Sequence, residues 1–271
     1  MTNNEYVSNE IIDESKIESH YSNGIATLTL NQPKSRNALS SNLISSLQIE
    51  LNRIAENQNI QVVVIAAKGP AFCSGHDLKE LRSLSNPDDI KELMSQCSNL
   101  MLSITCLPQP VIAKVHATAT AAGCQLVASC DLAIASDTAS FATPGVKIGL
   151  FCSTPMVALS RCIASKHAMQ MLLTGDPIDA ETAWRFGLVN EVVSIENLDK
   201  TVATYAEKLC STPTRVVSIG KEAYYKQREL DLKSAYELTS EVMVQNLLMK
   251  ESDEGISAFL HKKSPRWLSN N

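Results

Sequence analysis

Two apolar, β-branched segments, each preceded by an amphipathic helical pattern, constrain the fold of this chain more than any other feature. After the N-cap residue Ser40, apolar residues recur at helical spacing over 43–54 and are followed by the apolar run 61–66. A second helical pattern over about 88–107 leads to the strand Val111–Val115. Apolar strands joined by helices indicate parallel pairing with right-handed crossovers.

The segments before and after these two units add further strands, and the C-terminal third of the chain is predicted to be helical. Residues 17–21 and 25–30 alternate as strands around a turn in which Gly24 supplies a positive φ, which predicts a hairpin. A buried helix over 121–129 precedes two further strands. Those strands are 132–136 and 140–142, and helices are predicted at 166–173, 180–186, 197–209, 213–227, 232–249 and 253–261. We therefore expect an α/β layer followed by a helical third.

Composition excludes several classes of protein. The 271 residues contain 24 Lys plus Arg and 29 Asp plus Glu, so the net charge of −5 disfavours nucleic-acid binding. No apolar stretch approaches the ~20 residues of a membrane-spanning helix, and we expect no membrane partner. Eight cysteines are scattered singly, without CxxC pairs or metal-ligand spacing. We expect reduced thiols, no metal and a cytoplasmic location.

Common catalytic motifs do not occur in the sequence. There is no G-x-G-x-x-G, no P-loop and no G-x-S-x-G nucleophile elbow. Cys73, His76 and Asp77 lie close together and suggest a nucleophile with its base. Because triads are usually assembled from distant segments, ordinary hydrogen-bonded loop residues are the better interpretation.

Two small-residue segments offer exposed backbone amides. The loop 69–77 follows a strand and is rich in glycine, and 118–123 opens the predicted helix at 121–129. Amides at a helix N-terminus favour negative charge, and two such donors can hold a developing oxyanion. The alternative is close packing of that helix against the sheet.

At these segments the sequence resembles the crotonase superfamily of enoyl-CoA hydratases and isomerases. The resemblance runs from about residue 17 to 267 and includes LNQP (30–33), NAL (37–39), FCSGHDL (72–78), 110–126, 142–144, 254–255 and 258–259. It implies a spiral of ββα turns with a C-terminal helical region, assembled as a homo-trimer or a dimer of trimers. The implied division is a mobile leader (1–15), a spiral core (16–210) and a helical trimerisation region (211–271).

The resemblance also implies site residues. The backbone N–H groups of His76 and Ala122 match the two oxyanion-hole donors, which polarise the carbonyl of an acyl-CoA thioester and stabilise its enolate. The coenzyme A enters as part of the substrate, with no separate cofactor. Positions near the CoA moiety are Lys34, Arg36, Ser74, Lys79, Phe259 and Lys262, the last two often supplied by a neighbouring subunit. A solvated basic rim is an equally weighted alternative for the lysines.

Two departures from the family pattern concern the catalytic acids. Hydratases of the family place glutamates where this chain has Gln125 and Gly145. Glutamine exchanges no proton near neutral pH and glycine has no side chain, so efficient hydration by the usual mechanism is not expected. Candidate side chains to face the acyl group instead are Thr143, Cys152, Ser153 and His76 itself.

Three functions remain open at this point. AAGCQ (121–125) and GLFCSTP (149–155) resemble a hydratase domain-containing group of the superfamily for which no reaction can be carried over. The leading hypothesis is a CoA-thioester enzyme of lyase or isomerase type. The alternatives are an inert acyl-CoA binder or assembly subunit, and an enzyme that isomerises, decarboxylates or hydrolyses the thioester.

Overall fold

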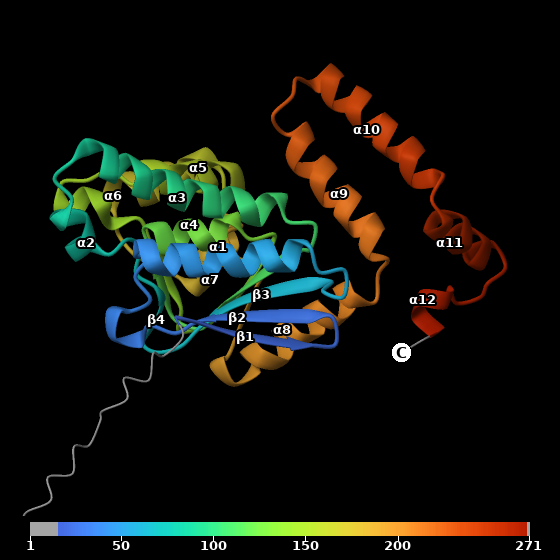
Figure 1. Ribbon diagram of the computed structural model, residues 1–271, viewed down its shortest axis with the longest axis horizontal. Helices are drawn as coiled ribbons and strands as arrows, with labels where there is room; N and C mark the ends of the chain where they lie inside the picture. Colours follow the sequence, from blue (N-terminus) through green and yellow to red (C-terminus); the bar gives the residue numbers. More distant parts are fainter. Residues whose placement is uncertain (1–15, 270–271) are drawn as a thin grey trace, which may run out of the picture.

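The computed structural model describes residues 16–269, which form two β-sheets covered by helices (Figure 1). One sheet has six strands in the order β1-β2-β3-β5-β7-β10, and the other has four in the order β4-β6-β8-β9. The strands are β1 (Ile17–Ser22), β2 (Ile25–Leu30), β3 (Val62–Ala67), β4 (Ala71–Cys73), β5 (Val111–Val115), β6 (Thr118–Thr120), β7 (Leu132–Ser136), β8 (Ser140–Ala142), β9 (Ile178–Asp179) and β10 (Glu191–Val193).

Helices connect and cover these strands. They are α1 (Ser41–Ala55), α2 (Leu78–Ser83), α3 (Pro87–Cys106), α4 (Ala122–Ser129), α5 (Ser153–Cys162), α6 (Ser165–Thr174), α7 (Ala180–Phe186), α8 (Ile195–Cys210), α9 (Thr214–Gln227), α10 (Leu232–Leu247), α11 (Lys250–Leu260) and α12 (Arg266–Ser269). Short 3-10 helices occupy Pro33–Ser35 and Pro144–Ile148.

The predicted hairpin and parallel sheet are confirmed. β1 and β2 pair antiparallel around Asn23 and Gly24, which have φ values of 50° and 77°. β2, β3, β5, β7 and β10 then pair in parallel. Strand β3 is apolar throughout because Val63 and Ile65 pack in the main core, whereas Val62 and Val64 pack against helix α8 on the opposite face.

The second sheet turns the layers into a spiral. β4, β6 and β8 follow directly after β3, β5 and β7, and β4 pairs in parallel with β6, which pairs in parallel with β8. The resulting ββα turns match the crotonase-like fold expected from the sequence. The sequence analysis predicted the three-residue strand β8 but missed β4, β6, β9 and β10, because strands of two or three residues give only a weak alternating pattern.

Asn37 ties the loop before α1 to the connection between the two sheets. Its Nδ2 donates to the carbonyls of Lys68 and Ala71 at 2.8 and 2.9 Å, and its Oδ1 accepts from the amide of Gln32 at 2.8 Å. The side chain is fully buried, and the backbone has a φ of 52°, which asparagine tolerates better than most residues. These bonds fix the chain where β3 passes into β4.

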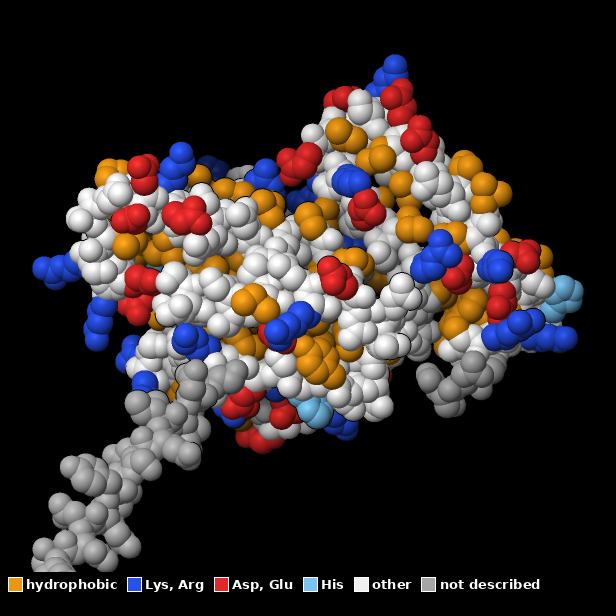
Figure 2. All heavy atoms as spheres, in the orientation of Figure 1, with side chains coloured by type: hydrophobic (Ala, Val, Ile, Leu, Met, Phe, Trp, Pro, Cys, Tyr) orange, Lys and Arg blue, Asp and Glu red, His pale blue; other side chains and the backbone are white. Residues whose placement is uncertain are grey.

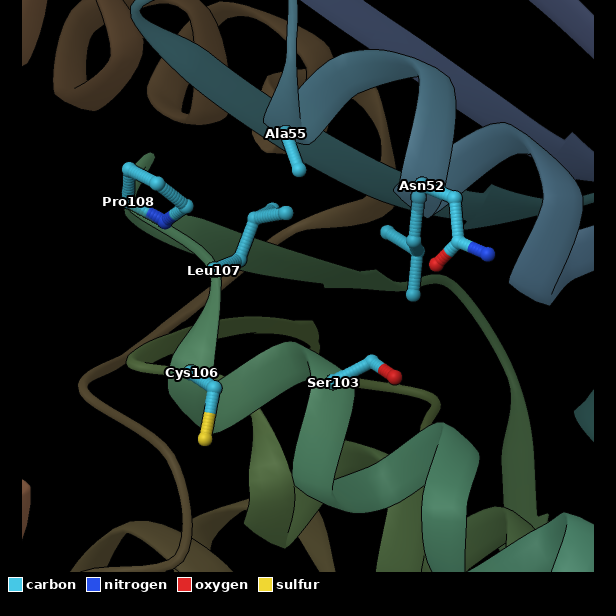
Figure 3. A pocket seen from close by; sticks show the side chains of 7 residues that line it. Asn52, Ala55, Ser103, Cys106, Leu107 and Pro108 are labelled. Atoms are coloured by element: carbon cyan, nitrogen blue, oxygen red, sulfur yellow. The ribbon is translucent and has the colours of Figure 1, made fainter.

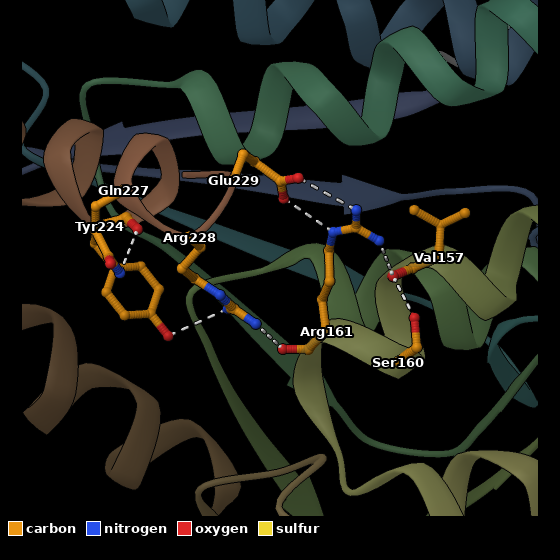
Figure 4. Close-up of polar contacts among 7 residues, drawn as sticks. All are labelled: Val157, Ser160, Arg161, Tyr224, Gln227, Arg228 and Glu229. Carbon is orange, nitrogen blue, oxygen red and sulfur yellow. Dashed lines mark hydrogen bonds and ion pairs between the residues drawn. The ribbon is translucent and has the colours of Figure 1, made fainter. Parts of the chain in front are cut away.

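The helices α9 to α12, here called the C-terminal arm, extend away from the sheets (Figure 1). A largely buried Lys221 fastens α9 to the core, since its Nζ donates to Asp131 at 2.6 Å and to the carbonyl of Gln109 at 2.9 Å. Beyond α9, Glu229 accepts from Arg161 of α5 at 3.1 Å, and the Arg228 guanidinium donates to the Arg161 carbonyl (Figure 4). No residue of α10 or α11 is buried.

Replacing Asn37 by glycine tests its role as the tie. Asn37→Gly keeps the positive φ accessible but removes all three hydrogen bonds, so we expect a loss of about 3 kcal/mol in the free energy of unfolding. Urea denaturation followed by circular dichroism measures it. Asn42→Ala, an exposed position in α1, is the control and should change the value by less than about 0.5 kcal/mol. Equal losses would contradict the assignment.

Candidate functional site

The candidate site lies where the three short parallel strands β4, β6 and β8 end. The carboxyl ends of adjacent parallel strands meet at one edge of a sheet, and each is followed here by one predicted site segment. His76 follows β4, Ala122 follows β6, and Thr143 follows β8. The amide of Ala121 donates to the carbonyl of Ala142 at 2.9 Å, which joins the last two segments directly.

Gly75 shows how closely the first two segments approach each other. A Cβ built on Gly75 would lie 3.2 Å from the amide nitrogen of Ala122 and 2.8 Å from the Cβ of Ala121. One built on Gly123 would lie 2.2 Å from the carbonyl oxygen of Cys73. Glycine at both positions therefore lets the β4 loop pack against the start of α4. The neighbouring amides of His76 and Ala122 are brought to one place by this contact.

The backbone at the start of α4 is strained. Ala121, the residue before the helix, has φ 50° and ψ −120°, a conformation that L-residues with a Cβ rarely adopt. Such outliers commonly cost about 1–3 kcal/mol and gather at functional sites. Ala122 is the first helical residue, and within residues 16–269 its amide and that of His76 donate no hydrogen bond. Both amides are thus available as donors.

Buried polar side chains single out two further residues. Among residues 16–269, the buried polar side chains all belong to uncharged residue types, namely Asn37, Gln109, Gln125, Ser129, Ser136 and Thr143. Of these, the Gln125 Oε1 and the Thr143 Oγ1 are buried atoms without a hydrogen-bond partner in the described part of the chain, as is the Oε1 of Gln109. Gln125 lies one turn into α4, and Thr143 follows Ala142, whose carbonyl accepts a hydrogen bond from the amide of Ala121 beside Ala122.

Cys152 takes the space in which a side chain at position 145 would begin. A Cβ on Gly145 would lie 2.9 Å from the Cys152 Sγ and 2.9 Å from the carbonyl oxygen of Leu150. Burial raises the pKa of the Cys152 thiol. Ser153 is exposed instead, and its Oγ donates to the carbonyl of Phe151 at 3.4 Å within its own turn. A glutamate at position 145 therefore does not fit this backbone.

Four of the predicted CoA-contacting residues lie around the β4 loop. The amide of Ser74 donates to the carbonyl of Arg36 at 3.1 Å, and Lys34 is on the same loop as Arg36. Lys79 is exposed in the first turn of α2. Phe259 and Lys262 are at the end of α11 in the C-terminal arm, on the opposite side of the molecule from α2 (Figure 1). One chain does not bring these two groups together.

Cys73, His76 and Asp77 do not form a triad. Cys73 is fully buried, and burial raises the pKa of its thiol to about 12. Asp77 caps α2 by accepting from the amides of Lys79 and Glu80 at 2.8 and 3.2 Å. Within residues 16–269, neither ring nitrogen of His76 has a hydrogen-bond partner. The nucleophile hypothesis is therefore unsupported.

Two surface hollows that lie elsewhere in residues 16–269 contain none of the predicted site residues. The one between α1 and α3 is lined by Leu51, Asn52, Ala55, Ser103, Cys106, Leu107 and Pro108 (Figure 3). Among residues 16–269, no three His, Cys, Asp or Glu side chains are grouped to hold a metal ion. No helix in the same range is both long enough and apolar enough to cross a bilayer.

Comparisons with known proteins agree with this architecture. The family model described as enoyl-CoA hydratase/isomerase matches residues 20–270. The chain therefore belongs to the enoyl-CoA hydratase/isomerase family. It is 49% identical over 244 residues to human enoyl-CoA hydratase domain-containing protein 3, covering 90% of this chain and 80% of the relative. The Xenopus laevis protein of the same name is 50% identical, and the match covers 90% of this chain and 83% of that protein.

Solved structures give the same result. A crystal structure of an enoyl-CoA hydratase from Mycobacterium smegmatis superposes with a TM-score of 0.92 at 44% identity, covering 94% of this chain and 99% of that one. The human domain-containing protein 3 superposes with a TM-score of 0.89 at 48% identity, covering 92% and 99%. The resemblance seen in the sequence, including its particular group, is confirmed.

The predicted cytoplasmic location is wrong, because it conflicts with the names of these relatives. The human, rat, mouse and Xenopus laevis proteins are all named mitochondrial. All eight cysteines of this chain are free thiols. Free thiols distinguish reducing from oxidising compartments but not one reducing compartment from another, so cysteine usage did not justify the narrower inference.

Substituting Gly75 tests the contact that joins the two amide-bearing segments. Gly75 and Gly187 have the same φ of 87°, but a Cβ on Gly187 meets no atom within 4 Å. Alanine at either position is strained by the positive φ. Gly75→Ala also clashes with the start of α4, so it should lower the free energy of unfolding by about 1–3 kcal/mol more than Gly187→Ala does. Chemical denaturation of both variants measures the difference. Equal values would mean that the segments are not in tight contact.

The buried imidazole of His76 gives a pH dependence of stability. Burial lowers the pKa of His76 below its ordinary value, so below pH ~6.5 the unfolded chain binds a proton that the folded chain excludes. Stability is complete above this pH and falls as the pH drops, by up to about 1.4 kcal/mol per pH unit. Urea unfolding between about pH 7.5 and 5.5 should show a shallower fall in His76→Gln. An unchanged slope would contradict this account.

Proposed function

We propose that this protein binds an acyl-CoA thioester and stabilises its enolate oxygen with the backbone amides of His76 and Ala122. The observation that supports this most directly is the contact of Gly75 with the amide of Ala122, which puts two otherwise unused N–H groups on adjacent segments. Family membership and relatives named enoyl-CoA hydratases support the thioester as the ligand class.

The two amides act electrostatically on the thioester oxygen. A thioester carbonyl carries partial negative charge that becomes a full charge when an enolate forms, so fixed N–H donors bind the enolate more tightly than the ground state. Each such donor is worth about 2.7–4 kcal/mol in a transition state. Ala122 also stands at the positive end of the α4 dipole, which favours the same charge. The hydrogen bond from the amide of Ala121 to the Ala142 carbonyl helps to hold the strained backbone that positions the amide of Ala122.

The acyl-CoA nucleotide is proposed to lie along the β4 loop, with Lys34, Arg36 and Lys79 facing its phosphates. Phe259 and Lys262 would then come from a second copy, since the arm places them far from α2 in one chain. Exposed apolar side chains along the arm support assembly into a trimer or hexamer (Figure 2). They include Leu232, Tyr236, Leu248, Phe259 and Leu260, which are 68–83% exposed.

Enzymatic activity is proposed in preference to an inert binder. Gln125 and Thr143 remain buried without hydrogen bonds, and each such group costs about 1–3 kcal/mol of stability. A bound acyl group with polar substituents relieves this cost in an enzyme and in a binder alike, and the preference for an enzyme rests on the two amides, which bind an enolate more tightly than the ground state. Hydration is disfavoured because Gln125 replaces one family acid and Cys152 fills the place of the other.

A comparison of two ligands tests the amide pair. Acetyl-CoA has the carbonyl and its thioether analogue S-ethyl-CoA does not, so isothermal titration calorimetry should show acetyl-CoA binding about 10- to 30-fold more tightly. Gly75→Ala puts a Cβ against the amide of Ala122, displaces this donor and should reduce the preference about tenfold.

Gly187→Ala, at a glycine with the same φ of 87° but with no atom within 4 Å of its Cβ, is the matched control and should leave the preference intact. Equal affinity for the two ligands would refute the amide pair. No affinity for either ligand or for CoA would refute acyl-CoA binding altogether. Turnover of no CoA thioester, with the carbonyl preference retained, would favour the inert binder.

A further inference from the structure

We propose that the imidazole of His76 is the catalytic base of this site, and that it takes a proton from carbon 2, the carbon next to the thioester carbonyl. This inference rests on the proposed function, because the enolate that forms is held by the same two amides. It gives the side chain of His76 a role separate from that of its backbone. The chain then has a proton acceptor although it lacks both family glutamates.

The ring of His76 belongs to the residue whose amide faces the thioester oxygen. His76 forms a parallel β-bridge with Leu39, in which the amide of Leu39 donates to the carbonyl of Gly75 at 2.7 Å. In such a bridge the neighbours of the bridging residue bond to the partner, so the N–H of His76 itself faces away from Leu39. Carbon 2 is two covalent bonds from the oxygen that this N–H would hold. A ring on the same Cα can therefore reach it.

The imidazole keeps a lone pair near neutral pH. Within residues 16–269, neither ring nitrogen has a hydrogen-bond partner. Burial lowers the pKa of His76, although the backbone of Leu39 and the carboxylate of Glu80 favour the charged ring. The ring is thus neutral at pH 7, and a neutral imidazole has one N–H and one nitrogen that accepts a proton. General bases work best with a pKa near the working pH.

The other acidic side chains near the amide pair are occupied or protonated. Asp77 caps α2 by accepting from two backbone amides at 2.8 and 3.2 Å. Glu80 accepts from the amide and the hydroxyl of Ser41 at 2.9 and 2.5 Å. The thiol of Cys152 stays protonated because burial raises its pKa. In the described part of the chain, His76 is the side chain beside the amides that is left to accept a proton.

Helix α2 bears on how an acyl group reaches the ring. Both ring nitrogens are covered by neighbouring atoms, so the cover must shift when carbon 2 approaches. α2 brings Glu80 near the ring, yet none of its six residues is buried. An element with so little buried surface moves at low cost.

The proton transfer balances without another reagent. The electron pair of the C–H bond forms the C=C bond of the enolate, the carbonyl oxygen takes the negative charge at the two amides, and the proton goes to the ring nitrogen of His76. The carboxylate of Glu80 favours the imidazolium that results. Return of a proton to carbon 2 restores the thioester and the base. Exchange of a hydrogen on carbon 2 with solvent is the measurable result, and nothing is oxidised or reduced.

The substitution His76→Gln removes the base and keeps the amide. In D₂O, mass spectrometry should show deuterium entering carbon 2 of butyryl-CoA about 100-fold faster with the protein than in buffer, and His76→Gln should lose this gain. The preference for acetyl-CoA over S-ethyl-CoA should remain, since both backbone donors remain. His116→Gln is the matched control, because this part-buried histidine contacts the Gly69 carbonyl at 2.8 Å through its Nε2 and should leave the exchange unchanged.

A pH profile and chemical rescue separate a base from a merely structural side chain. Because the base must be neutral, exchange by the unsubstituted protein should fall as the pH drops through the lowered pKa of His76, below pH ~6.5, and His76→Gln should lack this fall. Imidazole added to His76→Ala should restore exchange.

Three results would overturn the proposal. No exchange by the unsubstituted protein, or equal exchange by His76→Gln, would remove His76 as the base and leave the amide pair in place. Loss of the acetyl-CoA preference in His76→Gln, without rescue of His76→Ala by imidazole, would show that the ring only shapes the loop. Failure of every acyl-CoA to bind would defeat the proposed function itself.

Discussion

Parallel pairing of three very short strands is the constraint on which the site depends. β4, β6 and β8 contain three residues each, yet their ladder places the ends of three chain segments at one edge. Everything assigned to the acyl group follows one of these ends within five residues: His76, Ala122 with Gln125, and Thr143. Because such short strands contribute little stability, they depend on larger elements for their position, namely the long strands of the first sheet and the tie made by Asn37.

The candidate site of this protein differs in charge from the site of a family member that has two catalytic acids. A hydratase needs groups that exchange protons, whereas the buried polar residues here are all of uncharged types. At position 145 the backbone leaves no room for a side chain, since Cys152 and the carbonyl of Leu150 fill the space beside Gly145. The titratable side chains at these segments, His76 and Cys152, are both uncharged near neutral pH because burial disfavours their charged forms.

The C-terminal arm is the part of the fold on which the proposed assembly depends. Its base is fastened by the Lys221–Asp131 pair, at which Tyr225 also donates to Asp131 at 2.9 Å, but α10 and α11 bury none of their residues within the described chain. A helical arm held firmly at one end and apolar along its length is suited to packing against another copy. Division of the chain at residue 210 and the trimerisation role of 211–271 stay predictions, and the predicted leader, 1–15, lies outside the described residues.

The sequence by itself determined the long elements, because their apolar periodicities extend over five or more residues: the hairpin, the strands β3, β5 and β7, and the helices that cover them. Its motifs also identified the family and the two amide-bearing loops. Only the tertiary structure decided that Gly75 touches the start of α4, that Cys152 occupies the space beside Gly145, and that Gln125 and Thr143 lack partners. Such contacts join residues far apart in the chain, and no local pattern of residue types encodes them.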